Sequence, residues 1–304
     1  MVWTGSAFPT LVPFVRSLMA HSTSRFRFVA NACPPDQVAL MQRFRDEHPD
    51  RVIEVLPVSE DLIAHGQALD IVRAQRDDGA WFSLVDPDIK ANGPWVDDLT
   101  AFLCDHRVVT SGKEVWTDDN LVPEENFGVA GEHFFGRDGF VYGSPHLAIY
   151  QRCALEETTA RWGIGLGSAG PELSDHAKER LRQMGIEYLV FETAKLVNTF
   201  MQADGHALVH HDLPQLIHIG GLSHYIAPSS YRTTETGEQA PEWTRWDNMA
   251  TRHDVTRFTA HCLLAELDGN PAPAVPGGLD PVMETKLSLV RAEVIELVAC
   301  HGAS

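Results

Sequence analysis

A chain of 304 residues with 44% hydrophobic and 22% charged residues can bury a substantial core, which argues against a disordered protein. Its formal net charge of −18 argues against nucleic acid or an acidic lipid surface as the main partner. An anionic substrate is still possible if a local cation, such as a metal ion, offsets that charge.

The cysteines and the apolar segments bear on cellular location. The five cysteines are scattered and form no C-x-x-C pair, so we expect reduced thiols and no zinc ribbon. No basic run precedes the apolar part of residues 1–17, unlike in a secretory signal. No apolar stretch approaches the ~20 residues of a membrane-spanning helix. We therefore expect a cytoplasmic protein with no membrane span and no nucleic-acid partner.

Strand-like and helix-like segments alternate at the start of the chain. Residues rich in β-branched and aromatic side chains predict strands at 1–3, 25–32, 51–58 and 81–85. Apolar residues at helical spacing predict helices at 8–22, 36–49 and 62–79. This alternation predicts β-α-β units and a mostly parallel sheet with helices on both faces.

The middle of the chain is less regular. Residues 105–170 are rich in Gly, Phe and His and predict short strands with long loops, a usual place for substrate contacts. A helix is predicted over 172–185, with Ser174 or Asp175 as its N-cap. Residues 226–241 are polar and rich in turn formers, so we expect them to be mobile.

Two long helices are predicted near the C-terminus, over 242–269 and 281–300. A joint rich in Pro and Gly separates them. They either pack on the main domain or form a homodimer contact. We expect a nucleotide-binding and catalytic domain over 1–225 and a helical extension over 226–304.

The strand predicted at 81–85 ends in two aspartates separated by one proline, Asp86-Pro87-Asp88. Residues i and i+2 of a strand point to the same side, so the two carboxylates repel unless a proton or a cation lies between them. Ligands of open parallel sheets bind outside the carboxyl ends of the strands. Hard divalent cations prefer carboxylate oxygens and often share their other positions with phosphates. A surface turn is the alternative, but the preceding strand is apolar apart from Ser83, which favours a functional pair.

The region around this motif resembles glycosyltransferases of the GT-A fold, close to family 2-type enzymes. Those enzymes have an alternating β-α-β nucleotide-binding half and then an Asp-X-Asp motif at a strand end. A helix with a His/Gly-Ala-Leu-Asn-like signature precedes the motif. At the same interval this chain carries His65, Gly66, Ala68, Leu69 and Asp70. The resemblance covers residues 1–225 and is most specific over 65–89.

The resemblance implies a GT-A type α/β fold, with a mostly parallel Rossmann-like sheet flanked by helices and a C-terminal helical extension. It implies a UDP- or GDP-sugar donor whose diphosphate is held by Mn²⁺ or Mg²⁺ at Asp86 and Asp88. It also implies contacts to the donor from strand ends and the helix before the motif, at Thr4, Gly5, Ser6, Asn31, His65, Asp70 and Asp86. The family often has an Asp where this chain has Asn31, which leaves the base open, and a turn residue is the alternative there.

A histidine-rich segment over 206–224 offers further metal ligands. GT-A enzymes often complete the metal site with a histidine from beyond the sheet, and His-Ile-Gly-Gly-Leu-Ser-His at 218–224 resembles that segment. Its two glycines would let the backbone approach a ligand closely. The resemblance makes His224 the first expected ligand and His218 the second. An ordinary half-buried strand histidine is the alternative for each.

Inverting glycosyl transfer needs a carboxylate to take the proton of the acceptor hydroxyl. Family 2-type enzymes place an acid near the start of a helix after the acceptor region, where this chain has Glu172 and Asp175. The alternative role of Asp175 is to cap that helix.

The favoured function is transfer of a sugar from a nucleotide sugar to an unidentified acceptor hydroxyl, and we expect inversion at the anomeric carbon. A nucleotidyltransferase that makes the sugar nucleotide is one alternative, although the loop after the first strand lacks the basic, glycine-rich sequence such an enzyme needs. A metal-dependent hydrolase built on the histidines and a non-catalytic metal- or nucleotide-binding protein are the others. The sequence contains no G-x-x-x-x-G-K phosphate loop, which excludes a P-loop NTPase.

Overall fold

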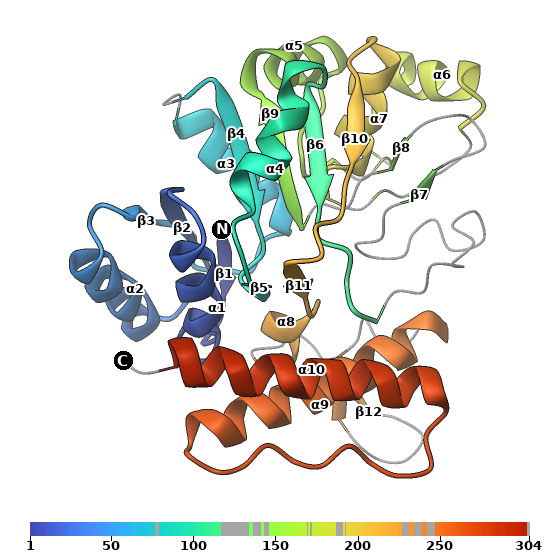
Figure 1. Cartoon of the computed structure of the whole chain (residues 1–304). Helices are drawn as coiled ribbons and strands as arrows, with labels where there is room; N and C mark the ends of the chain where they lie inside the picture. The colour runs from blue at the N-terminus through green and yellow to red at the C-terminus, as the bar shows by residue number, and fades with distance from the viewer. Residues whose placement is uncertain are drawn as a thin grey trace.

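Two neighbouring sheets form the framework of the protein (Figure 1). The first has the order β1-β2-β3 and is wholly parallel, with strands Val2–Thr4, Phe26–Asn31 and Val52–Ser59. The second has the order β10-β6-β9-β4, with strands Leu208–His210, Val108–Ser111, Leu147–Gln151 and Trp81–Val85. β10 is parallel to β6, while β9 is antiparallel to both of its neighbours.

The computed structural model describes the whole chain except residues 77–78, 117–133, 136–140, 143–145, 169, 171, 187–190, 192, 227–230, 234–238, 242–246 and 303–304. It describes only the backbone of residues 134–135, 141–142, 224, 231–233, 239–241 and 247–253.

The predicted alternation of strands and helices is confirmed. Three helices follow the first three strands: α1 (Phe8–Ala20), α2 (Pro35–Glu47) and α3 (His65–Gln75). Side chains at helical spacing on α1 (Leu11, Phe14, Val15 and Leu18) are almost fully buried. The α/β class with a parallel sheet flanked by helices is therefore as expected.

Short elements surround the second sheet. β5 (Ile89–Ala91) pairs antiparallel with β11 (Leu216–His218). Between β5 and β6 lie α4 (Val96–Thr100) and a 3-10 helix (Ala101–Cys104). Two hairpins complete the strands, β7 (Phe134–Phe135) with β8 (Val141–Tyr142) and β12 (Tyr231–Thr233) with β13 (Gln239–Pro241). The remaining residues of the segment 226–241, which we expected to be mobile, lie largely outside the described part.

The described residues 146–162 are more regular than expected, because β9 runs directly into α5 (Arg152–Trp162). Two of the buried positions of α5 are Thr158 and Thr159, so apolar residues alone do not reveal its helical period. The predicted helix over 172–185 is α6 (Asp175–Gln183), whose N-cap Ser174 accepts a hydrogen bond from the Ala177 N–H. α7 (Lys195–Ala203) was not predicted.

The two C-terminal helices pack on the main body. α8 (Leu222–Ile226) leads towards α9 (Asp247–Leu267), and α10 (Pro281–His301) ends the fold. The buried face of α10 joins the same hydrophobic cluster as α1 and α9, through Leu287, Val290, Val294 and Leu297. Of the two alternatives for these helices, packing on the main domain is thus observed. The domain boundary at 225 and a homodimer remain predictions.

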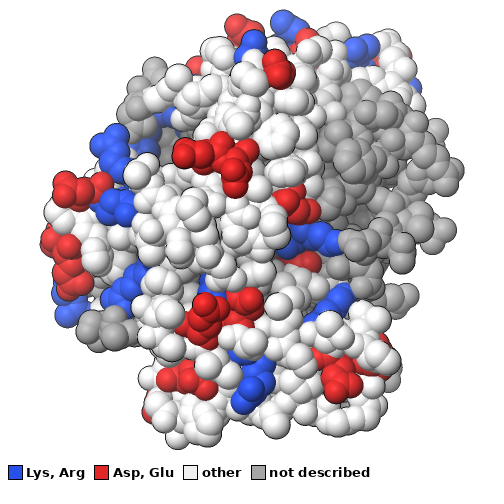
Figure 2. Space-filling view, in the orientation of Figure 1, with Lys and Arg blue, Asp and Glu red and all other residues white. Residues whose placement is uncertain are grey.

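A cavity of about 640 Å³ separates parts of the two sheets, between β2 and β4. Its lining is mostly apolar and includes Val29, Leu84 and Trp95. No helix among the described residues is both long enough and apolar enough to cross a bilayer. On the face drawn in Figure 2, Lys and Arg side chains lie scattered among Asp and Glu side chains.

Candidate metal centre

Carboxylates and imidazoles from four separate segments meet at one edge of the second sheet. Asp86 directly follows β4, and Glu114 follows β6 after a short turn. His146 directly precedes β9, which is antiparallel, so its beginning lies at the ends of its neighbours. His218 ends β11, whose pairing with β5 sets it opposite Ile89. Strand pairing alone therefore gathers these groups.

His146 lies between two carboxylates. Its Nδ1 is 2.7 Å from Asp86 Oδ2, and its Nε2 is 3.4 Å from Glu114 Oε1. Burial lowers the pKa of His146, but Glu114 and Asp86 raise it by more, to about 10. In the absence of another cation, His146 is therefore an imidazolium that neutralises part of the acidic cluster.

The contacts of His218 fix its tautomer. Its Nδ1 is 2.7 Å from the Gly112 carbonyl oxygen, which only accepts, so Nδ1 carries a proton. Its Nε2 is 3.4 Å from Asp88 Oδ1. A neutral His218 would thus point a lone pair at a carboxylate, which is favourable only with a proton or a metal ion in place there.

Asp88 is almost fully buried, with 3% of its surface exposed. Its Oδ2 accepts a hydrogen bond of 3.0 Å from the Leu222 N–H at the start of α8. Burial alone would raise the pKa of Asp88, but hydrogen bonding and charge from His218 outweigh it and hold the pKa at about 2. Asp88 is therefore an anion that needs a cationic partner.

The cluster fits a divalent cation. Ligand atoms of Asp86, His146 and His218 all lie within 4.8 Å of one another. Two imidazole nitrogens with carboxylate oxygens suit a transition metal such as Mn²⁺ better than Mg²⁺, which prefers oxygen ligands alone. A metal ion here would also compensate the charges of Asp88 and Glu114.

Glycines and a pocket open one side of the cluster. At Gly220, with φ of +77°, a Cβ atom would lie 2.5 Å from Glu114 Oε1, so a side chain there would displace Glu114. A pocket of about 430 Å³ borders Glu114 and His218 and is also lined by Lys113 and Lys286. The pocket thus adjoins the cluster on the side of Glu114 and His218.

The expected residues of the helix before the motif have different surroundings. His65 Nε2 is 3.9 Å from Asp86 Oδ1, so His65 adjoins the cluster, and burial lowers its pKa. The carboxylate of Asp70 accepts hydrogen bonds from the Leu166 and Gly167 N–H groups, at 3.0 and 2.9 Å. A Cβ at Gly66 would lie 2.5 Å from the Gly167 Cα. Asp70 therefore holds the loop 165–167 against α3, and the missing side chain of Gly66 allows the close approach.

The strand-end residues expected to contact the nucleotide are placed as follows. The Asn31 amide donates to the Ile63 carbonyl at 2.8 Å and accepts from the Ile63 N–H at 3.1 Å, so it holds two chain segments together. Thr4 ends β1, and Gly5 and Ser6 form the turn after it, Gly5 with φ of +53°. Their contacts with a nucleotide stay a prediction.

The expected roles of His224 and of the two base candidates stay predictions. His224 lies in α8, but its side chain is outside the described part of the chain. Glu172 and Asp175 are exposed, at or just before the start of α6. Figure 1 shows α6 near the opposite end of β10 from β11, and the role of these two acids as base stays a prediction.

Sequence reasoning missed His146 and Glu114. Both lie beside a strand end, as Asp86 does, and that position was the available signal. It was hidden for His146, because Gly-Ser-Pro-His lies in a glycine-rich region where we expected only short strands and loops. The antiparallel direction of β9, which brings its first residue to this edge, has no local signature in sequence.

No protein-family model matches the chain, and no curated protein matches it either. Solved structures are similar over most of its length. The mannosyltransferase PcManGT from Pyrobaculum calidifontis, in complex with GDP-Man and Mn²⁺, has 12% identity and a TM-score of 0.44, over 99% of this chain and 72% of that one. GalNAc-T7 with UDP, GalNAc and Mn²⁺ has 12% identity and a TM-score of 0.45, over 98% of this chain and 56% of that one.

The galactosyltransferase LgtC, in complex with donor and acceptor sugar analogues, has 10% identity and a TM-score of 0.45, over 91% of this chain and 97% of that one. At 10–12% identity and TM-scores no higher than 0.45, the likeness identifies no donor, acceptor or reaction for this chain.

The charge on His146 should make the metal-free protein less stable in alkaline solution. Its folded pKa of about 10 exceeds the ordinary 6.5, so its stabilising contribution is complete below pH 6.5 and is lost as the pH rises towards 10. In EDTA, the free energy of unfolding should fall by about 1 kcal/mol more per pH unit for the wild type than for His146→Gln between about pH 7 and 9. Urea denaturation across this range measures both slopes, and equal slopes would contradict the proposed ionisation of His146.

Proposed function

We propose that the protein is a divalent-cation-dependent glycosyltransferase, which moves a hexosyl group from a UDP- or GDP-sugar to an acceptor hydroxyl. The observation that carries this proposal is the buried cluster of carboxylates and imidazoles at the strand ends, where α/β proteins bind their ligands. Asp86, His146 and His218 would hold Mn²⁺ there, with Asp88 beside them.

The charge balance supports an anionic substrate at this cluster. A chain with a formal charge of −18 repels a nucleoside diphosphate unless a local cation attracts it. When bound, the cation would supply electrostatic stabilisation of the departing diphosphate. His65 is half-buried beside Asp86, and we infer that it contacts a group bound next to the cation.

Two backbone groups orient side chains of the cluster in this proposal. The Gly112 carbonyl holds the His218 ring so that Nε2 faces the cluster, as carbonyl groups commonly do for metal-binding histidines. The Leu222 N–H holds one carboxylate oxygen of Asp88 and leaves the other towards His218. Both contacts orient donor atoms before any ligand arrives, which reduces the cost of binding.

We infer inversion at the anomeric carbon, with the acceptor oxygen approaching opposite the diphosphate. Such a displacement needs a carboxylate across the pocket from the metal ligands to take the acceptor proton. Asp175, the base expected from the sequence, is exposed at the start of α6. NMR of the product anomer distinguishes inversion from retention.

Nucleotide binding should depend on the metal. Calorimetry with UDP and with GDP should give at least one dissociation constant that is tighter by about tenfold or more with Mn²⁺ than with EDTA, since ligands in such sites bridge the cation and the phosphates. His218→Gln should remove this difference. His211→Gln is a matched control, because that histidine contacts Phe102 and not the cluster.

The same samples separate the competing functions. Release of UDP or GDP from a sugar donor in Mn²⁺ supports a transferase, while metal-dependent binding without release indicates a binding protein. A bridging cation would be contradicted if each nucleotide, UDP and GDP, bound with the same affinity in Mn²⁺ as in EDTA.

The placement of α6 gives a second prediction. If Asp175 is only an exposed residue of the first turn, Asp175→Asn should keep the turnover number within about twofold, because the general-base effect is typically 10²–10⁴-fold. The measurement is steady-state release of nucleoside diphosphate with an acceptor. A loss of about a hundredfold would instead restore Asp175 as the base and require α6 to approach the donor during the reaction.

A further inference from the structure

The C-terminal helix α10 contacts both chain segments that supply acids to the cluster. Lys90 on β5, two residues after Asp88, is only 3% exposed. Its Nζ lies 2.6 Å from Glu293 Oε2 and 2.8 Å from Glu296 Oε2, and both acids belong to α10. Asn92, just after β5, donates a hydrogen bond of 2.9 Å to the same oxygen of Glu293.

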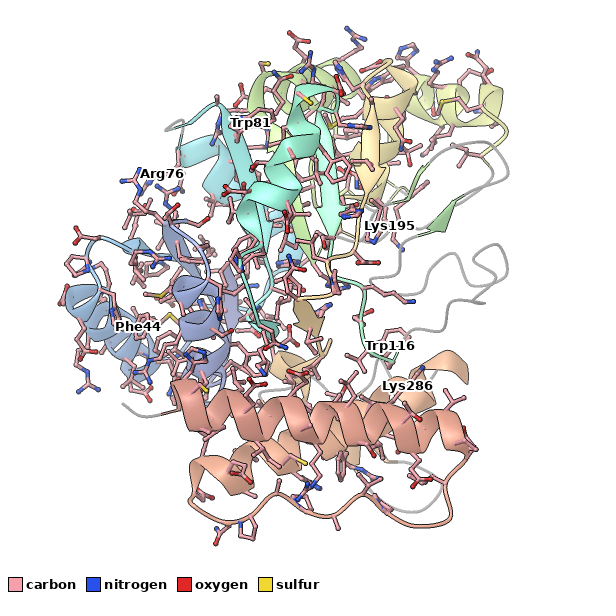
Figure 3. The ribbon with its side chains drawn as sticks, viewed as in Figure 1. Phe44, Arg76, Trp81, Trp116, Lys195 and Lys286 are labelled. Atoms are coloured by element: carbon pink, nitrogen blue, oxygen red, sulfur yellow. The ribbon has the colours of Figure 1, made fainter. Side chains whose placement is uncertain are left out.

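A second contact reaches the segment that carries Glu114. Lys286, near the start of α10, donates a hydrogen bond of 2.6 Å to the Trp116 carbonyl, and Figure 3 shows the two residues side by side. Trp116 is two residues after Glu114. Lys286 and Glu293 are seven residues apart, or about two helical turns, so they lie on one side of α10.

Strand pairing transmits the position of β5 to the metal ligands. Ile89 is paired with His218, and the Val115 N–H donates to the His218 carbonyl at 2.9 Å. Asp88 immediately precedes the strand. A shift of β5 therefore moves Asp88 and His218 together.

The contacts of Lys90 are not equivalent. The side chain of Glu293 is 17% exposed, while that of Glu296 is 62% exposed. A charge pair that is removed from water needs both partners, whereas an exposed pair contributes little. Glu293 is therefore the partner that fixes Lys90, and Glu296 adds a solvent-facing contact.

We propose that α10 is a positioning element of the metal centre and that Glu293, through Lys90, sets the geometry in which Asp88 and His218 meet the cation. The inference rests on the proposed function, since it assumes that the cluster binds a divalent ion. Glu293 touches no ligand itself and acts as a positioning residue. The helical extension thereby contributes to metal affinity in addition to covering the core.

The test is Mn²⁺ affinity in the absence of nucleotide, followed by the loss of the free Mn²⁺ signal in electron paramagnetic resonance. Glu293→Ala should weaken Mn²⁺ binding by about tenfold or more, as residues that support metal ligands typically do. Glu293→Gln, which keeps the size and can still accept from Lys90 and Asn92, should recover part of the affinity. Glu296→Ala is the matched control on the same helix and should change the affinity by less than about threefold.

The outcomes separate the inference from the function on which it rests. If the wild type binds no Mn²⁺, the proposed function fails and this inference fails with it. If the wild type and both Glu293 variants bind Mn²⁺ with equal affinity, the positioning role alone is overturned. Equal losses in Glu293→Ala and Glu296→Ala would also overturn it, because the proposal assigns the role to the buried partner. Thermal unfolding in EDTA shows whether Glu293→Ala folds. If it does not, the Mn²⁺ affinity of Glu293→Gln is compared with that of the wild type instead.

Discussion

Compensation of buried negative charge is the constraint on which the rest of the site depends. Asp88 and Glu114 are 3% and 2% exposed, and an isolated carboxylate at such depth is strongly unfavourable. The described contacts of these acids include His218 and His146, imidazoles that can take up either a proton or a metal ion. One cluster can thus be a protonated network without metal and a ligand set with it, and binding of a cation must release protons.

The fold assembles this cluster from short elements. β5 and β11 are three-residue strands, yet their pairing joins the Asp-Pro-Asp motif to a histidine far along the chain. The turn after β11 contains Gly220 and Gly221, both with positive φ, and leads into α8, whose first N–H binds Asp88. α10 then anchors β5 through the ion pair between Glu293 and Lys90. Function and stability are coupled here, because the strand that carries Asp88 is also the one anchored to the C-terminal helix.

Sequence reasoning predicted the parts of this arrangement that depend on local pattern. The alternation of strands and helices up to Val85 follows from periodicity, and the Asp-Pro-Asp motif from its place after an apolar strand. His218 was named as a metal ligand, second to His224. His146 and Glu114 escaped because their proximity arises from the order and direction of β6 and β9, which are set by long-range pairing. Asn31 and Asp70 hydrogen-bond backbone groups of their own chain, which their residue types alone do not reveal, and their contacts with a nucleotide stay a prediction.

We propose that Asp86, His146 and His218 form a divalent-cation site. Anomalous diffraction from a crystal soaked in Mn²⁺ tests it most directly, because the signal locates the ion without any assumption about activity. We expect a peak in direct contact with a carboxylate oxygen of Asp86 and with ring nitrogens of His146 and His218. A Mn²⁺ peak elsewhere in the molecule, with none between these side chains, would contradict it.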